Sequence, residues 1–350
     1  MSALPQGPRI VVFGAGAVGA TIGGWLTPHH PKTWLVDLPA VAQALNDKGL
    51  TLYCSDTPAQ REHVKVQATG DLKSIPRPDV VLLCTKTYSL DKVCPVIKSA
   101  WGDDILVVGF QNGVDNQKVL PQYFKRTAYG IVAYNAWIDA PGVVGFQKKG
   151  PLVMGTPDNS WNAELEELAD LMSRGVETVV TEELTDAAHS KMVVNLANSL
   201  TTLIGHKIRP LSDDALFQKL LTNLTAEGVG ILRAAGYHEV RLGGMPSWLL
   251  MRAAAKLPRC LTKRAFDKNV KKMVMSSMAQ DILQRGGKDS ELESLNGYFI
   301  KLADRYGVNA PFNRAVYRLC REGFAQPGFQ PLDVKEVWRQ VQAQLKQSSS

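Results

Sequence analysis

The glycine-rich stretch "FGAGAVG" (residues 13–19) constrains the fold more than any other part of the chain. Its spacing is G-x-G-x-x-G, and it follows an apolar run and precedes a helical pattern. In that setting the first glycine permits a tight turn, the second lets the backbone approach a pyrophosphate, and the third lets helix and strand pack closely. The sequence therefore predicts a strand–turn–helix unit that binds a dinucleotide, whereas a purely structural turn is the alternative. The residues of this predicted site are Gly14, Ala15, Gly16, Ala17, Val18 and Gly19.

The second apolar run, residues 33–38, carries an acidic residue near its end, Asp37. A carboxylate about 20 residues after such a turn accepts hydrogen bonds from the adenosine ribose and repels a 2′-phosphate. No arginine or lysine follows directly, since the next residues are Leu38, Pro39 and Ala40. We therefore expect NAD(H) or NADP(H) as cofactor, with NAD(H) favoured. The alternative for Asp37 is a strand-end or helix-capping role.

The first half of the chain alternates short apolar runs with helical patterns. The runs expected as strands cover residues 9–16, 33–38, 79–86, 104–112 and 127–137. Continuous apolar strands separated by helices indicate a parallel sheet that is covered on both faces. We therefore expect residues 1–180 to form an α/β domain, a doubly wound parallel sheet of the Rossmann type.

The pattern changes in the second half, where the periodicity is helical almost without interruption. We expect an all-helical domain over residues 181–345 that binds substrate or mediates dimerisation, followed by a disordered tail over residues 346–350. The length of 350 residues also favours two domains over one.

The composition excludes several classes of protein. With 45% hydrophobic and 21% charged residues the chain is expected to be globular. No apolar run approaches the roughly 20 residues that span a bilayer, and the N-terminal residues lack the pattern of a secretory signal. The five cysteines are scattered and lack metal-binding spacing. We expect a cytoplasmic protein with reduced thiols, no bound metal and no membrane partner.

The net charge is +7, and the densest basic cluster is "KLPRCLTKRAFDKNVKKM", residues 256–273. A basic patch can bind nucleic acid, but this one lacks interleaved exposed aromatic residues and any recognisable binding module. We interpret it as a solvated helix face and expect no nucleic-acid partner. A basic cleft would equally suit small anionic ligands.

A polar stripe interrupts the apolar helical stretch "HSKMVVNLANSLTTLIG", residues 189–205. Lys191, Asn195 and Asn198 are spaced i, i+4 and i+7, so they share one face of a helix. Each polar group costs free energy inside a protein unless something pairs with it. The spacing therefore predicts that this face lines a wet cleft. The alternative is a lysine that reaches the surface beside structural amides.

Two polar residues follow apolar strands of the expected sheet. Asn112 is the last residue of the run 104–112, just beyond its apolar part, and Lys86 is the last residue of the run 79–86. Ligands bind at the carboxyl ends of strands in open α/β sheets, so both residues are candidates for cofactor or substrate binding. For Lys86 the alternative is an ordinary surface lysine at a strand end.

Two further candidates lie in the C-terminal half. Glu291 follows Ser290 in "SELE", which looks like a helix start with Ser290 as N-cap and Glu293 completing a capping box. The alternative role of Glu291 is to complement the helix dipole. Ser277 and Asp281 are spaced i, i+4; we expect Ser277 to face a substrate and Asp281 to give local support.

These motifs together resemble the ketopantoate reductase (2-dehydropantoate 2-reductase) family nearly from end to end. The resemblance rests on "FGAGAVG", "LLCTKTY", "FQNGVDN", "KMVVNLANSL" and the composite "SSMAQDI…SELESLNGYF…YGVNAPFN". It implies a Rossmann domain followed by a helical domain, and reduction of 2-dehydropantoate to (R)-pantoate, a step of pantothenate biosynthesis, with a nicotinamide cofactor. It also implies roles at matching positions: general acid for Lys191, substrate binding or lysine orientation for Glu291, and contacts with substrate or cofactor for Lys86, Asn112, Asn195, Asn198 and Ser277.

The chain departs from the family pattern around the cofactor and substrate positions. Leu38 stands where the typical member has an arginine that grips the 2′-phosphate of NADP, and Ser199 stands where proline often does. The helix after Lys191 looks one residue shorter than the usual pattern of the family, which leaves the alignment of Asn198 with that pattern open. Two alternatives therefore remain: an NADH-dependent reductase of another branched or aromatic 2-keto acid, and a cofactor-binding sensor without turnover. A homodimer is also compatible with the sequence.

Overall fold

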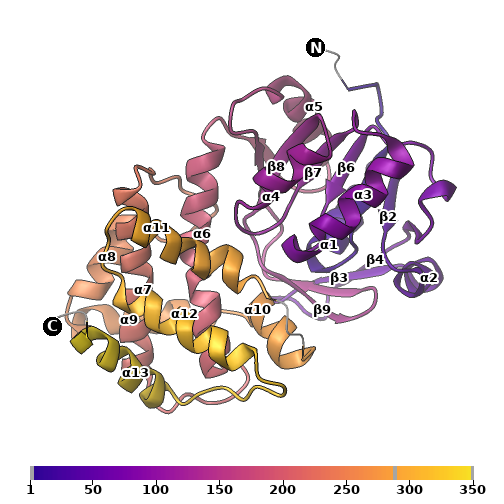
Figure 1. Ribbon diagram of the computed structural model, residues 1–350. Helices are drawn as coiled ribbons and strands as arrows, with labels where there is room; N and C mark the ends of the chain where they lie inside the picture. The colour runs from indigo at the N-terminus through magenta and orange to yellow at the C-terminus, as the bar shows by residue number, and fades with distance from the viewer. Residues whose placement is uncertain (1–3, 287–289, 348–350) are drawn as a thin grey trace. The chain divides into compact units, whose positions relative to one another are not determined.

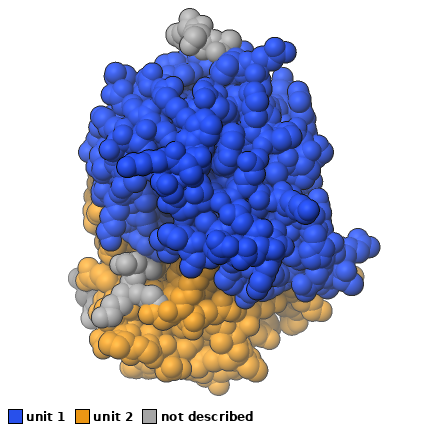
Figure 2. Space-filling view, turned by 90° about the vertical axis from the view of Figure 1, so that its right-hand side faces the viewer, with its two compact units in different colours: residues 1–185 blue, residues 186–350 orange. Residues whose placement is uncertain are grey.

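The computed structural model of the protein describes residues 4–286 and 290–347. The chain divides into two compact units, residues 1–185 and residues 186–350 (Figure 2). The first unit contains the sheets, and the elements of the second unit are helices (Figure 1). The expected fold class, a Rossmann-type sheet followed by a helical C-terminal domain, is confirmed.

The central sheet of the first unit has eight strands in the order β12-β11-β8-β7-β6-β1-β2-β5. Every neighbouring pair is parallel except β11 with β8. The central strands β1, β6 and β7 consist mostly of buried valine, leucine and isoleucine, which suits a sheet covered on both sides. The strands are β1 (Ile10–Phe13), β2 (Thr33–Val36), β5 (Gln67–Thr69), β6 (Val80–Leu83), β7 (Leu106–Gly109), β8 (Arg126–Val132), β11 (Leu152–Gly155) and β12 (Thr178–Val180).

Helices connect these strands, as Figure 1 shows for the indigo and purple part of the ribbon. Each of the five helices comes next after a strand of this sheet, α3 with a short 3-10 turn in between: α1 after β1, α2 after β2, α3 after β6, α4 after β7 and α5 after β11. Such strand–helix alternation is what allows neighbouring strands to run parallel. The helices of the first unit are α1 (Ala17–Leu26), α2 (Pro39–Lys48), α3 (Leu90–Trp101), α4 (Asn116–Val119) and α5 (Asn162–Ser173).

A second sheet of four strands was not predicted by the sequence pattern. Its order is β4 (Arg61–Val64), β3 (Leu50–Cys54), β10 (Val143–Phe146) and β9 (Ala136–Ala140). The prediction of one strand over residues 127–137 is therefore wrong, because β8 ends before β9 begins in the other sheet. An apolar run does not reveal where the chain passes from one sheet to the next, since the strands on both sides bury apolar side chains.

The second unit consists of helices that pack around α7. Asp213 caps α7 by accepting hydrogen bonds from the N–H groups of Ala215 and Leu216. The helices are α6 (Leu184–Ile204), α7 (Asp214–Ala234), α8 (Trp248–Lys256), α9 (Arg259–Lys272), α10 (Ser277–Ala279), α11 (Tyr298–Arg305), α12 (Pro311–Phe324) and α13 (Val334–Gln347), with π-helical turns at Gln280–Gln284 and Glu293–Gly297.

The C-terminal end of the chain, membrane-spanning helices and the cysteines were each the subject of a sequence-based expectation. Helix α13 continues through Gln347, two residues into the segment 346–350 that was expected to be disordered; residues 348–350 lie outside the described part of the chain. Within the described ranges, no helix is long and apolar enough to cross a membrane. All five cysteines lie within those ranges and have free thiols.

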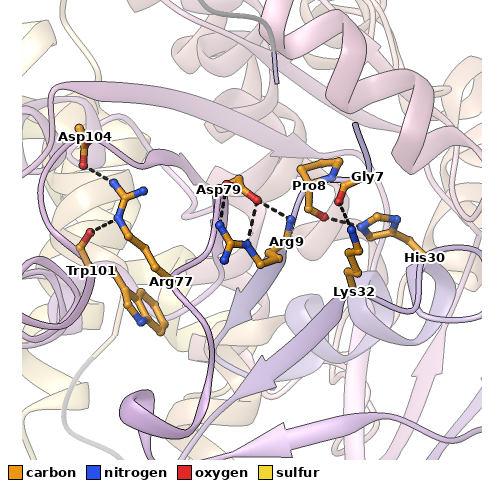
Figure 3. Close-up of polar contacts among 9 residues, drawn as sticks. All are labelled: Gly7, Pro8, Arg9, His30, Lys32, Arg77, Asp79, Trp101 and Asp104. Carbon is orange, nitrogen blue, oxygen red and sulfur yellow. Dashed lines mark hydrogen bonds and ion pairs between the residues drawn. The ribbon is translucent and has the colours of Figure 1, made fainter. Parts of the chain in front are cut away.

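Polar contacts tie the amino ends of strands β1 and β6 together (Figure 3). The Asp79 carboxylate accepts hydrogen bonds from the Arg9 backbone N–H at 2.8 Å and from the Arg9 guanidinium at 3.2 Å. Burial alone would raise the pKa of Asp79, but the hydrogen bonds from Arg9 outweigh burial and hold it below its ordinary value. Nearby, the carbonyl of Pro8 is bonded by His30 Nε2 at 2.6 Å. This edge is opposite to the carboxyl ends of the strands, where the candidate site residues of the first unit lie.

Candidate active site

The glycine turn has the geometry that its spacing predicts. Gly14 has a φ of +99°, and a side chain there would meet the backbone nitrogen of Thr85 at 2.9 Å. A Cβ on Gly19 would lie 1.8 Å from the carbonyl oxygen of Gly14, so helix α1 packs on the turn without room for a methyl group. Gly16 differs, because a Cβ on it would meet nothing within 4 Å. The turn therefore leaves open space at the glycine that would approach a pyrophosphate.

The N-terminus of α1 extends this open region. Gly16 is the N-cap residue, and no side chain caps the helix there. The first N–H groups of a helix have no partner within it, and they attract anions together with the helix dipole. Ala17 and Val18 occupy this first turn. The structure thus presents the backbone that a dinucleotide phosphate needs, and the residues fit such a cofactor.

Asp37 has a structural role that the sequence did not reveal. Its Oδ2 accepts a hydrogen bond from the Ala15 N–H at 2.6 Å, and its Oδ1 accepts one from the Leu38 N–H at 2.7 Å. The carboxylate therefore holds the glycine turn against the end of β2. Each carboxylate oxygen has a second lone pair, so ribose hydroxyls can still be accepted. Leu38 beside it is exposed.

The loops after β6 and β7 are joined by a network of carboxamides. Gln111 Nε2 donates to the carbonyls of Leu83 at 2.8 Å and Thr85 at 3.0 Å, and its Oε1 accepts from Asn116 Nδ2 at 3.1 Å. The two candidate residues of these loops, Lys86 and Asn112, are both half-buried. Sequence reasoning missed Gln111 and Asn116, although two buried carboxamides beside an apolar strand were visible in "FQNGVDN". They fix the backbone that carries the candidates.

Helix α6 carries the predicted polar stripe on one face. It is continuous from Leu184 to Ile204, so Lys191, Asn195 and Asn198 keep their i, i+4, i+7 spacing, and all three are half-buried. Neighbouring residues of this helix are fully or almost fully buried, namely Met192, Val193, Leu196, Ser199 and Leu200. The helix is unbroken between Lys191 and Asn198. The contact of Asn198 with a substrate stays a prediction.

Lys191 has an unusual electrostatic environment. Burial lowers its pKa from the ordinary 10.5 to about 8, although the negative charge of Glu291 acts in the opposite direction. Part of the Lys191 side chain remains accessible to solvent, so it is desolvated by surrounding protein rather than sealed off. Glu291 is buried, with 5% of its surface exposed. An amine of this kind is charged at neutral pH and can release its proton readily.

The start of the helical segment after Glu291 differs from the expected capping box. Ser290 Oγ accepts a hydrogen bond from the Leu292 N–H at 3.3 Å, one residue short of the box position. The Glu293 carboxylate instead accepts a hydrogen bond from the Tyr317 hydroxyl at 2.7 Å. The capping-box prediction is wrong because this segment begins with a π-helical turn, which changes the position of the N–H groups.

Ser277 lies in the first turn of α10. Its neighbour Ser276 is the N-cap, and Ser276 Oγ lies 3.2 Å from Thr202 Oγ1 of α6. This contact sets Ser277 beside the turn of α6 that follows Asn198. Asp281 is buried and forms an ion pair with Arg285 at 3.0 Å, which accords with a local supporting role.

Helix α6 is joined to the segment after Glu291 by further contacts that sequence reasoning did not anticipate. His189 Nε2 lies 2.7 Å from the Tyr298 hydroxyl, and its ring stacks on Tyr237 at 3.7 Å. Asn296 Nδ2 donates to Ser199 Oγ at 2.9 Å. These contacts fix the position of α6 relative to the segment that carries Glu291.

In the described residues, no group of three or more His, Cys, Asp or Glu side chains could hold a metal ion.

Comparison with known proteins places this chain in a family. The profile described as "Ketopantoate reductase PanE/ApbA" matches residues 10–159, and its partner "Ketopantoate reductase PanE/ApbA C terminal" matches residues 183–323. The chain belongs to the ketopantoate reductase family. A curated relative, the 2-dehydropantoate 2-reductase of Pyrococcus abyssi, is 26% identical over 319 residues, covering 89% of this chain and 97% of its own. The family is one of oxidoreductases.

Solved structures show the same fold. A PanE/ApbA family ketopantoate reductase from Ralstonia eutropha JMP134 is 26% identical, with a TM-score of 0.68 over 89% of this chain and 97% of its own. D-mandelate dehydrogenase, solved with NADH and anilino(oxo)acetate, has a TM-score of 0.73 at 20% identity, covering 89% of this chain and 97% of its own.

Proposed function

We propose that the protein reduces the carbonyl group of a 2-keto acid, with 2-dehydropantoate as substrate and (R)-pantoate as product. The observation that carries this proposal is the half-buried amine of Lys191, whose pKa burial lowers to about 8 on the one polar face of α6. Membership of the ketopantoate reductase family supports the substrate class.

The reaction requires charge to be stabilised on the carbonyl oxygen. A nicotinamide cofactor supplies the hydride when bound. As negative charge grows on the oxygen, Lys191 Nζ stabilises it and donates the proton. Glu291 favours the charged form of Lys191, which keeps the acid protonated at neutral pH. Asn195, Asn198 and Ser277 are proposed to contact substrate oxygens.

The first unit supplies the proposed cofactor site. The backbone of residues 14–19 would hold the pyrophosphate, and Lys86 and Asn112 would contact cofactor or substrate. For the ribose end we propose NAD(H) as the preferred cofactor, since Asp37 would repel a 2′-phosphate and Leu38 offers it no positive charge. The hydrogen bonds of Asp37 to the turn mean that replacing it would also disturb the turn.

A second candidate is an NADH-dependent reductase of another branched or aromatic 2-keto acid. It is favoured by Asp37 and Leu38 at the proposed ribose site. The fold itself does not restrict the substrate, because D-mandelate dehydrogenase shares it.

Initial rates with NADH and NADPH against a panel of 2-keto acids that includes 2-dehydropantoate test these proposals. We expect oxidation of NADH with 2-dehydropantoate as the substrate of highest kcat/KM. A higher kcat/KM for an aromatic 2-keto acid would establish the second candidate. Cofactor binding by calorimetry without oxidation with any 2-keto acid would contradict both and leave a cofactor-binding sensor.

Assembly is tested separately. A related ketopantoate reductase from Staphylococcus aureus is described as dimeric, and we propose that this protein also forms a homodimer. Light scattering of the purified protein would give the mass of a dimer, about twice 38.3 kDa, or of a monomer.

A further inference from the structure

Helix α9, labelled in Figure 1, contacts helix α7 through Thr262 and Phe266. None of its 14 residues is buried. Thr262 accepts a hydrogen bond from Gln218 of α7 at 2.8 Å, and the Phe266 ring packs edge-on against Phe217 of α7 at 5.7 Å. The residues that hold α9 are therefore those spaced i, i+4 along this face, which leaves the opposite face to the solvent.

The opposite face of α9 combines a leucine with cations. Leu261, Arg264, Lys268 and Lys272 are spaced i, i+3, i+7 and i+11, so they share one face, and all four are exposed. Leu261 has 69% of its surface exposed. A large apolar side chain that is surrounded by cations and left in water is the arrangement of a binding surface rather than of an ordinary solvated helix.

Helix α8, which residues 257 and 258 join to α9, also has exposed leucines. Leu249 and Leu250 in its first turn are 74% and 62% exposed, and Leu257 after its last turn is also exposed. We call the exposed leucines and cations of residues 249–272 the α8–α9 surface. Among the large hydrophobic side chains that are exposed in the described residues, four of ten belong to it.

The charge of the α8–α9 surface accounts for the charge of the whole protein. Residues 248–273 contain eight of the 40 lysines and arginines but one of the 33 acidic residues, Asp267. The remaining sequence thus has 32 basic and 32 acidic residues, and the net charge of +7 resides in this segment. The Asp267 carboxylate is paired with Lys263 at 2.5 Å, so it offers little to an outside cation.

We propose that the α8–α9 surface binds peripherally to a bilayer that contains anionic phospholipids. The cations would lie at the headgroup phosphates and carboxylates, and the leucines would enter the boundary between headgroups and acyl chains. This proposal departs from the sequence-based expectation of a solvated helix face and no membrane partner, which does not account for leucines that are 48–74% exposed. The inference is independent of the proposed reaction.

Other occupants fit the surface less well. A second copy of the chain would bring two surfaces of like charge together, which is unfavourable. A free phosphate would use the cations but leave the leucines in water. A single-stranded nucleic acid is bound through stacking on aromatic rings, and Phe266, the aromatic residue of α9, packs against α7 instead. The phosphates of a duplex would use the cations but leave the leucines in water.

Co-sedimentation of the full-length protein with vesicles tests the proposal. One set of vesicles contains phosphatidylcholine alone, and the other also contains about a third phosphatidylserine. We expect at least about ten-fold tighter binding to the anionic set, since each lysine or arginine near such a surface contributes about five-fold. Raising the salt from about 0.1 M to about 0.5 M should remove most of the binding.

Two double variants separate the apolar and the electrostatic contributions. Leu249→Ser with Leu261→Ser keeps every charge, and Lys268→Glu with Lys272→Glu keeps every leucine. All four side chains are exposed, and circular dichroism checks that each variant is folded. The leucine variant should lose about ten-fold or more in vesicle affinity, because the insertion of one leucine alone is worth about that much. The charge variant should also lose about ten-fold or more, because each cation near the anionic surface is worth about five-fold.

Matched controls carry the same changes elsewhere. Val96→Ser replaces an exposed apolar residue of α3, and Lys65→Glu with Lys73→Glu replaces exposed lysines of the first unit. All should bind vesicles as the wild type does.

Four results would overturn the proposal. They are equal or absent binding to the two vesicle sets, full binding by the leucine variant, loss of binding in the controls, and conversion of a wild-type dimer into a monomer by the leucine variant without vesicles. The last of these would identify the surface as an interface between copies of the chain.

Discussion

Glu291→Gln and Lys191→Arg should change the alkaline side of the pH profile in opposite directions. If protonated Lys191 donates the proton, kcat/KM of the wild type falls as the pH rises through about 8, the pKa that burial gives this amine. With that pKa, about 90% of the lysine is charged at pH 7 and about 10% at pH 9, so the activity falls roughly ten-fold per unit beyond.

The magnitude follows from the environment of the amine. The difference between the ordinary pKa of 10.5 and the value of about 8 corresponds to about 3 kcal/mol in favour of the neutral form. The charge of Glu291 opposes this effect, so its removal in Glu291→Gln should move the alkaline limb to lower pH. In Lys191→Arg the guanidinium stays charged at all accessible pH values. The alkaline limb should then disappear, and kcat should be far lower because arginine is a poor proton donor.

The assay is the initial rate of NADH oxidation from about pH 6 to about pH 10 at constant ionic strength and saturating cofactor, with the 2-keto acid varied. Lys301→Arg, an exposed lysine of α11, serves as the control and should leave the profile unchanged. A wild-type profile that stays flat through pH 10 would remove Lys191 as the acid. An identical alkaline limb in Glu291→Gln would contradict the electrostatic coupling while leaving the reaction itself in place.

Three further outcomes are expected. Gly16→Ala should fold normally and weaken cofactor binding by about ten-fold or more, because its methyl group meets no protein atom but occupies the pyrophosphate position. Gly19→Ala should fail to fold, because its Cβ would meet a carbonyl oxygen. Calorimetric titration and thermal melts distinguish the two variants, and equal effects would refute the assignment. Leu38→Arg should raise kcat/KM with NADPH relative to NADH, since the exposed side chain can reach a 2′-phosphate, and no change in the ratio would argue against the ribose site. Asp79→Ala should lower the free energy of unfolding in urea by about 1–2 kcal/mol at pH 7. The difference from wild type should shrink as the pH falls below about 4, because the pKa of Asp79 is depressed in the folded protein and acid removes its contribution. A difference that persists at low pH would exclude the ion pair with Arg9 as the cause.

The sequence by itself determined the features that depend on neighbours along the chain. The spacing of Gly14, Gly16 and Gly19 predicted the turn, since the need for a positive φ or for close packing is a local property. The spacing of Lys191, Asn195 and Asn198 predicted a polar face, because the periodicity of a helix places them on one side. Continuous apolar runs predicted the parallel strands, because a strand that is buried on both faces is apolar at successive positions.

The tertiary structure alone decided what those features meet. Lys191 has its lowered pKa because the folded chain buries it, and the charge that opposes the shift comes from a residue one hundred positions later in the sequence. Asp37 holds the turn through Ala15, 22 residues away. The leucines of α8 and α9 follow the helical pattern of any core, and only the packing shows that they face outward. Burial and charge depend on contacts between distant segments, and the local pattern contains no record of which contacts form.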